Sequence, residues 1–274
     1  MVNLFIAVPC YGGKLHADFA QSLLRLTAEL GVEKIDCTVD FIGTESLICR
    51  ARNTFVSKFY ANPRYTHLLF LDSDLIFNPK AIITMIKRNK ELIGCPYPKK
   101  MYNVEKMNAL QEEGIPFHDM MGKHSTLITD INYNFISDDA NTKYLSEGSC
   151  YLAKDIPTGC MLIKRSALTA MMMAYPERQF RNNIFGLDSR QNDYYFDFFA
   201  TGVVEGIYLS EDYYFCFLAK SIALECWIEC GYTFGHIGVN TYYGNLEEQL
   251  QNFGMSDSLN LDKKLLSKYN ETSK

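Results

Sequence analysis

The sequence lacks the features that mark membrane, secreted and disulfide-rich proteins. No apolar run approaches the ~20 residues that a membrane-spanning helix needs, and residues 1–9 lack the basic start and the length of a signal peptide. The nine cysteines include no CxxC pair, Cys226 and Cys230 being the two closest, so zinc ribbons and disulfide frameworks are poorly supported. We therefore expect reduced thiols in a soluble, cytoplasmic protein.

A dense block of Lys and Arg is also missing. The formal charge of −5 disfavours a general nucleic-acid binder. No internal repeat and no linker rich in Gly, Ser or Pro divides the 274 residues, of which 47% are apolar and 22% charged, the balance of an ordinary globular protein. We expect a single domain with a nucleotide-binding half (1–100), a variable excursion (101–150), an acceptor or catalytic half (151–250) and a frayed tail (260–274).

The first hundred residues alternate strand and helix patterns. Strands are predicted at 4–9, at 37–42, over the apolar start of 68–77 and at 91–95, and helices at 17–30, 46–60 and 78–89, the last with Asn78 as N-cap. This alternation predicts an α/β fold with a mostly parallel central sheet flanked by helices. Later predictions are a helix at 104–112, alternation at 127–136, a strand at 159–164, a helix at 166–174 with Met171 to Met173 in the core, an aromatic segment at 194–199, a helix at 210–221 and a last strand pair within 224–234.

The most informative segment is LLFLDSDLIF, residues 68–77. Its apolar start is typical of a strand buried on both faces, and Asp72 and Asp74 follow it, separated by Ser73. At the rim of an open α/β sheet, where ligands bind, two carboxylates need a cation or hydrogen-bond donors. Mg²⁺ or Mn²⁺ carrying a diphosphate fits this need, although two solvated aspartates at a strand end are the simpler alternative.

Other segments have the chemistry of a nucleotide-diphosphate site. An aromatic and two glycines follow the first strand, in Pro9-Cys10-Tyr11-Gly12-Gly13, where the ring can stack on a base. Arg50 and Arg52 cannot share one helix face, so one can reach a phosphate at the rim while the other is solvated, and we favour Arg52 for the rim.

Two further segments bring acids and an imidazole. Ser210 is a candidate N-cap that places Glu211 and Asp212 in a first turn, where the helix dipole alone stabilises acids, but where a carboxylate at the mouth of a buried helix is also placed as a general base. His236 lies between two glycines after a strand, either as a close-packed turn residue or as a metal ligand.

In this order the segments resemble a glycosyltransferase of the GT-A fold, of the family-2-like soluble type found in bacteria and large viruses. The resemblance rests on FIAVPCYGG, ARN, LLFLDSDLIF, IGCPYPKK, PTGCMLIKRSAL, LSEDYYFC and GHIGVNTYYG, which span about residues 4–245. It implies a Rossmann-like sheet with a small antiparallel addition in the second half. It also implies transfer of a sugar from a nucleoside-diphosphate donor, with UDP-sugars the commonest, to the hydroxyl of a glycan or another acceptor.

The resemblance also implies roles for single residues. Asp72, Asp74 and His236 match the metal ligands for Mn²⁺ or Mg²⁺, with Asp74 the more direct. The nucleotide-binding residues would be Pro9, Tyr11, Arg52, Asp72 and Ser73, and Thr158 and Gly159 would border the donor sugar and acceptor. Asp212, with Glu211, matches the acidic motif whose aspartate deprotonates the acceptor in inverting members.

Several alternatives stay open. A haloacid-dehalogenase-type phosphatase also carries DxD after a buried strand, but it usually continues with glycine and Thr or Val where Leu75 and Ile76 stand. A sugar nucleotidyltransferase would want a glycine-rich basic loop after the first strand, of which Gly12, Gly13 and Lys14 are a faint version. A non-catalytic nucleotide-sugar-binding protein of the same fold is the third alternative. The sugar, the acceptor, the choice among UDP, GDP and dTDP, and the inverting or retaining outcome do not follow from the sequence.

Overall fold

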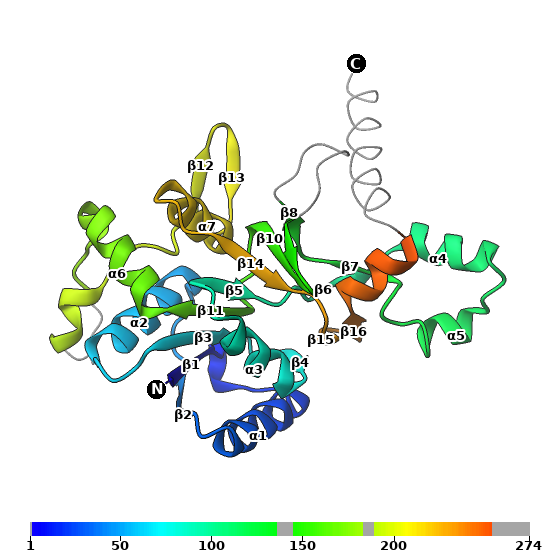
Figure 1. The fold of residues 1–274 in the computed structure, drawn as a ribbon, viewed down its shortest axis with the longest axis horizontal. Helices are drawn as coiled ribbons and strands as arrows, with labels where there is room; N and C mark the ends of the chain where they lie inside the picture. Colours follow the sequence, from blue (N-terminus) through cyan, green and yellow to red (C-terminus); the bar gives the residue numbers. More distant parts are fainter. Residues whose placement is uncertain (1, 136–144, 183–188, 254–274) are drawn as a thin grey trace.

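The computed structural model describes residues 2–135, 145–182 and 189–253 (Figure 1). The predicted tail at 260–274 and position 136 of the predicted alternation lie outside these ranges. No helix in the described ranges is long and apolar enough to cross a membrane.

A large mixed sheet forms the centre of the molecule, in the strand order β2-β1-β3-β11-β5-β14-β10-β8, with β9 paired to β10. Its strands are β1 (Asn3–Pro9), β2 (Asp36–Ile42), β3 (His67–Leu71), β5 (Leu92–Gly94), β8 (Asn134–Phe135), β9 (Ser146–Glu147), β10 (Cys150–Asp155), β11 (Cys160–Lys164) and β14 (Cys226–Glu229). Strands β1, β2 and β3 pair in parallel, as do β5 and β14, whereas β11 and β10 run antiparallel to their neighbours. The predicted α/β class is confirmed.

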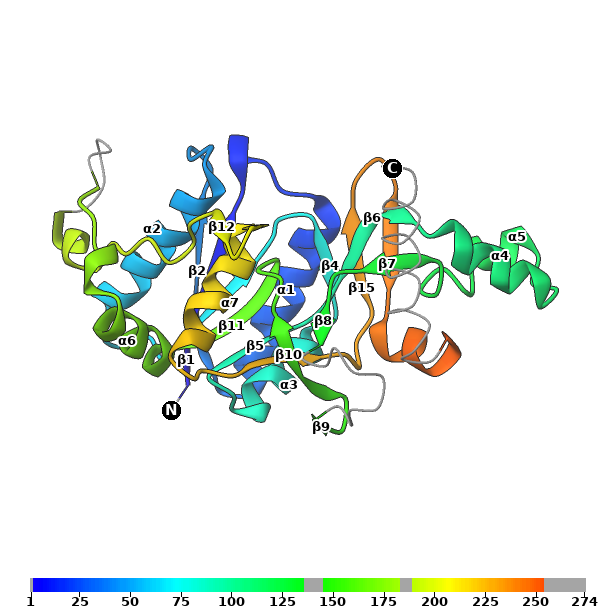
Figure 2. The same cartoon turned by 90° about the horizontal axis from the view of Figure 1, so that it is seen from above.

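Helices cover both faces of this sheet (Figures 1 and 2). The helices are α1 (Ala17–Val32), α2 (Ile48–Ala61), α3 (Pro79–Arg88), α4 (Val104–Glu112), α5 (Phe117–Met121), α6 (Arg165–Ala174) and α7 (Glu211–Ser221). Successive residues of β3 explain the layering, because Leu68 and Phe70 join the core under α2, α6 and α7, while Leu69 and Leu71 join the core under α1 and α3. The prediction that this strand is buried on both faces is confirmed.

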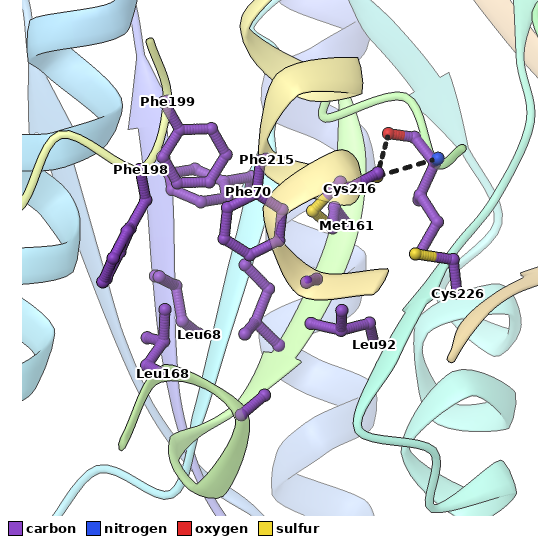
Figure 3. Close-up of a cluster of buried hydrophobic side chains, with 14 of the residues drawn as sticks. Leu68, Phe70, Leu92, Met161, Leu168, Phe198, Phe199, Phe215, Cys216 and Cys226 are labelled. Carbon is purple, nitrogen blue, oxygen red and sulfur yellow. Dashed lines mark hydrogen bonds between the residues drawn. The ribbon is translucent and has the colours of Figure 1, made fainter. Parts of the chain in front are cut away.

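The core under α7 is rich in aromatic rings (Figure 3). The rings of Phe199 and Phe215 stack with centroids 4.5 Å apart, and Phe70 meets Phe199 edge-on at 5.3 Å. These contacts anchor the first turns of α7 against the end of β3, which is the strand that leads into Asp72.

A second, three-stranded sheet has the order β16-β15-β4 and consists of β4 (Leu75–Phe77), β15 (Phe234–Ile237) and β16 (Thr241–Gly244). Its antiparallel pairing places His236 opposite Leu75, one residue from Asp74. The predicted strand pair within 224–234 is wrong, because β14 belongs to the central sheet and β15 to this smaller one. Strand β14 ends before Gly231, and β15 pairs with β4, which is distant in sequence, instead of with β14.

Two two-stranded sheets and a helical lobe complete the fold. Strands β6 (Pro98–Tyr102) and β7 (Thr129–Ile131) pair with each other, as do β12 (Gly202–Val204) and β13 (Ile207–Leu209). Helices α4 and α5 form a lobe with a small core of its own, inside the predicted excursion. In α6, Met171 is buried as predicted, but Met173 is 78% exposed, so the expectation that the whole methionine run fills the core is wrong.

Candidate active site

The candidate site lies where the carboxyl ends of β1 and β3 meet the start of α7. A pocket of about 350 Å³ opens there, lined by Pro9, Tyr11, Glu45, Ser46, Ile48, Ala51, Arg52, Asp72, Ser73, Asp74 and Glu211. All five predicted nucleotide-binding residues lie on this wall, together with Asp74 and Glu211. Because β1 and β3 are parallel neighbours, their ends must share an edge of the sheet, and segments distant in sequence converge there.

Arg52 links the two acidic segments from beneath the pocket. Its side chain is 3% exposed, and its Nη2 lies 3.2 Å from Asp72 Oδ1 while its Nε lies 3.3 Å from Glu211 Oε1. Burial alone would lower the pKa of Arg52, but the charges of Asp72 and Glu211 outweigh it and raise that pKa. The remaining nitrogen, Nη1, is buried and has no hydrogen-bond partner in the described part of the chain. Arg50 instead pairs with Glu45 at the surface, as the spacing predicts.

Asp74 is held by two nitrogen atoms. Lys100 Nζ lies 2.5 Å from Asp74 Oδ2, and His236 Nε2 lies 3.5 Å from the same oxygen. Burial would raise the pKa of Asp74, but the hydrogen bonds from His236 and Lys100 outweigh it and lower the pKa to about 2. Asp74 is therefore a carboxylate at any physiological pH.

The orientation of His236 suits a metal ligand. Its Nδ1 lies 2.8 Å from the carbonyl oxygen of Pro98, and since a carbonyl only accepts, Nδ1 carries the proton. Nε2 then faces the carboxylate of Asp74, and either a proton or a divalent ion between the two atoms can satisfy both of them. Two ligands that each bind one ion at about 2.1 Å are at most about 4.2 Å apart, so the observed 3.5 Å fits a shared divalent ion.

Asp72 does not stand with Asp74 and His236, because it is turned to Arg52. Over residues 2–135, 145–182 and 189–253 the structure contains no group of three or more His, Cys, Asp or Glu side chains arranged to hold a metal. The protein thus offers two ligands, Asp74 and His236, a number suited to Mg²⁺ or Mn²⁺ when phosphate oxygens and water complete the sphere.

Asp212 lies in the first turn of α7, one residue beyond Glu211. Burial raises the pKa of Asp212, against the hydrogen bond that it accepts from the Ser210 hydroxyl. The Tyr213 N–H also donates to Asp212, at 2.9 Å, and both bonds engage Oδ1. Ser210 is the N-cap residue, as predicted, but its side chain makes no capping bond to the backbone and holds the carboxylate instead. A half-buried carboxylate with a raised pKa and one oxygen engaged has the properties of a general base.

Tyr97, which the sequence analysis did not single out, is buried between Gly159 and His236. Its hydroxyl accepts a hydrogen bond from the Gly159 N–H at 3.2 Å, and its ring meets His236 edge-on at 5.3 Å. The Gly159 carbonyl in turn accepts from the Asp72 N–H at 2.9 Å. Gly159 and Thr158 thus lie behind the pocket wall, and the buried hydroxyl of Thr158 has no partner within the described residues.

Replacing Gly159 with alanine is expected to destabilise the protein and to distort the site. A Cβ at this position would lie 2.5 Å from the ring of buried Tyr97, and overpacking of this kind costs about 1–3 kcal/mol. Urea unfolding of G159A should show a lower midpoint with an unchanged slope. As a control, Gly31→Ala adds a Cβ without a clash, because Gly31, like Gly159, has no positive φ and has no atom within 4 Å of its Cβ position. Equal losses in G159A and G31A would contradict the steric explanation.

A larger hollow, of about 760 Å³, lies between α1 and the small sheet and is not the site we favour. Its charged lining residues are Arg25 and Glu29 only, on one helix. It contains none of the predicted site residues, whereas the smaller pocket gathers acids and a buried arginine from three segments.

No protein-family model matches the chain, and no curated protein matches it. Among solved structures, A197 from STIV is similar with a TM-score of 0.44 and 13% identity, over 87% of this chain and 86% of that one. A glycosyltransferase involved in the glycosylation of the major capsid of PBCV-1 gives a TM-score of 0.33 and 12% identity, over 68% and 72%. A proposed glucose-1-phosphate thymidylyltransferase from Bacillus anthracis, in complex with sucrose, gives 0.32 and 10%, over 86% and 89%. At these levels the function has to be argued from the site itself.

Proposed function

We propose that this protein is a metal-dependent glycosyltransferase that moves a sugar from a nucleoside-diphosphate donor to an acceptor hydroxyl. The observation that carries the proposal is the pair formed by Asp74 and His236, whose Oδ2 and Nε2 atoms face each other 3.5 Å apart beside a pocket with a buried arginine. A two-ligand site of this kind becomes complete when a diphosphate brings further oxygens. Asp74, in the DxD segment that follows β3, would thus serve as a metal ligand.

The pocket supports binding of the nucleoside. Tyr11 is 73% exposed at its mouth and offers a free ring face for stacking on a base, and Pro9 precedes it at the end of β1. Beneath them, the unpartnered Nη1 of Arg52 is a charged donor that a phosphate oxygen can satisfy. Asp72 and Ser73 line the same wall, within reach of a ribose. We assign the donor to this pocket, with UDP the first candidate among nucleotides.

The transfer itself needs a charge-stabilised leaving group and a base. A divalent ion held by Asp74 and His236 would supply Lewis-acid stabilisation of the departing nucleoside diphosphate. Asp212 would accept the acceptor's proton on Oδ2, because its Oδ1 is engaged by Ser210 and Tyr213. Glu211, bound to Arg52, would keep that guanidinium aimed at the pocket.

The nucleotidyltransferase alternative is weaker, because the backbone N–H groups of Gly12 and Gly13, in the loop after β1, are hydrogen-bonded within the protein. The Gly12 N–H donates to the Gly43 carbonyl at 2.9 Å, and the Gly13 N–H donates to the Cys10 carbonyl at 2.8 Å. A loop that cradles phosphates needs these donors free to point at the ligand.

Calorimetric titration with UDP and with GDP, each with Mn²⁺ and with EDTA, tests the proposal. We expect one nucleotide, UDP first, to bind with micromolar affinity in Mn²⁺ and at least about tenfold more weakly in EDTA, which corresponds to about 1.4 kcal/mol. Failure of both nucleotides to bind in the presence of Mn²⁺ would remove the main support for a transferase and favour the phosphatase. Metal-dependent binding without turnover of any sugar nucleotide would favour the non-catalytic alternative.

A further inference from the structure

Lys100 contacts Asp74 but has no role in the reaction proposed above. It lies on β6, whose pairing with β7 shifts register between Pro98 and Tyr102, so that Lys100 falls in the irregular stretch between them. Figure 2 shows β6 beside β15, the strand that carries His236. The side chain reaches from there to Asp74, where its Nζ lies 2.5 Å from Oδ2.

The surroundings of Lys100 leave its side chain room to reach this place. A Cβ at Gly238 would lie 3.1 Å from Lys100 Cδ and 3.5 Å from its Cγ, so the absence of a side chain at Gly238 leaves space for the aliphatic stem. Because the Pro98 carbonyl also fixes His236, β6 positions both the ring and the ammonium group around one carboxylate. The Lys100 side chain is still 41% exposed, and a long exposed side chain changes its rotamer easily.

The ammonium group of Lys100 and a metal ion compete for the same oxygen. Asp74 Oδ2 is the atom that faces both Lys100 Nζ and His236 Nε2. A divalent ion between Asp74 and His236 would lie within a few ångströms of a positive charge already bound there, and like charges at that distance repel strongly where the site is half-buried. The ion can bind well only if Lys100 leaves.

We propose that Lys100 is an internal cation that neutralises Asp74 in the empty site and moves to the diphosphate of the donor when a divalent ion takes its place. This inference rests on the proposed function and deepens it, because it assigns a second diphosphate-binding residue, which contacts Asp74 where Arg52 contacts Asp72. The exchange keeps each charge paired: the ion with Asp74 and His236, and the ammonium group with phosphate oxygens. Metal and donor should therefore bind together, each strengthening the other.

The test is the binding of Mn²⁺ alone, and then of UDP at saturating Mn²⁺, to wild type, Lys100→Met and Lys99→Met. Methionine keeps the length of the apolar stem and removes the charge, and Lys99 is an exposed neighbour on the same strand that is not among the residues lining the pocket. In K100M we expect Mn²⁺ alone to bind about tenfold more tightly and UDP with Mn²⁺ about tenfold more weakly. K99M should match wild type in both titrations.

These opposite changes separate the inference from a simple loss of structure, which would weaken both. Equal or weaker Mn²⁺ binding by K100M would overturn the role of Lys100 while leaving the metal site of the proposed function standing. An unchanged UDP affinity in K100M would overturn the movement to the diphosphate. If neither wild type nor K100M binds Mn²⁺, both the inference and the metal assignment are wrong.

Discussion

Replacing Asp74 with alanine is expected to abolish the Mn²⁺-dependent part of nucleotide binding and to reduce sugar transfer by about a hundredfold or more. Among the described residues, Asp74 and His236 are the two side chains that would hold the proposed ion, and removal of Asp74 would leave His236 alone, which cannot hold Mg²⁺ or Mn²⁺ against water. In calorimetry, the UDP affinity of D74A should be the same in Mn²⁺ and in EDTA. Release of nucleoside diphosphate from a panel of UDP- and GDP-sugars measures the loss of transfer.

The fold should survive this change. Asp74 is 24% exposed at the rim, and its side-chain partner Lys100 is 41% exposed, so water can solvate the ammonium group that is left. The lowered pKa of Asp74 means that its stabilising effect is present above pH 3.8 and is lost as the pH falls towards 2, so D74A should lack this acid-sensitive part of stability. Asp36→Ala is the matched control, because Asp36 is exposed at the amino end of β2, away from the site edge. Mn²⁺-dependent binding that persists in D74A would contradict the metal assignment.

The part of the site that the sequence predicts well follows from local patterns. The apolar run 68–71 alternates into two cores, which fixes the place of Asp72 at the sheet edge. The spacing of Arg50 and Arg52 puts them on different helix faces, and in the structure Arg52 is buried beside Asp72 while Arg50 is partly exposed beside Glu45. Strand and helix periodicity suffices here because each residue's environment is set by the element on which it lies.

The residues that the sequence analysis missed depend on contacts between distant segments. Lys100 reaches Asp74 through an irregular stretch of β6, and Tyr97 meets Gly159 only because β5 and β11 are neighbours in the sheet. The pairing of β15 with β4 was missed for the same reason, although it sets His236 beside Asp74. No periodicity within a short window encodes such pairings. The sequence does contain one chemical indication of a site here: a tyrosine and two lysines follow closely after the predicted strand at 91–95, in Tyr97-Pro98-Lys99-Lys100.

Replacing Asp212 with asparagine is expected to reduce transfer by about 10²–10⁴-fold while leaving the affinity for UDP and Mn²⁺ unchanged. The amide keeps the shape of the side chain and an oxygen that can accept from the Tyr213 N–H, so the first turn of α7 should stay in place. It removes a charge that burial disfavours, so the melting temperature should not fall. What is lost is the ability to accept a proton from the acceptor hydroxyl.

The pH dependence of wild type gives the same residue a second signature. A base works when it is deprotonated, so transfer should fall as the pH falls through the pKa of Asp212, which burial raises above its ordinary value. In D212N this acidic limb should disappear from the profile of residual activity. Glu105→Gln removes an exposed acid from the first turn of α4 and should leave both rate and pH profile unchanged. A D212N protein that melts earlier and binds UDP weakly would show instead that Asp212 stabilises the start of α7, and a D212N protein with normal turnover would exclude it as the base.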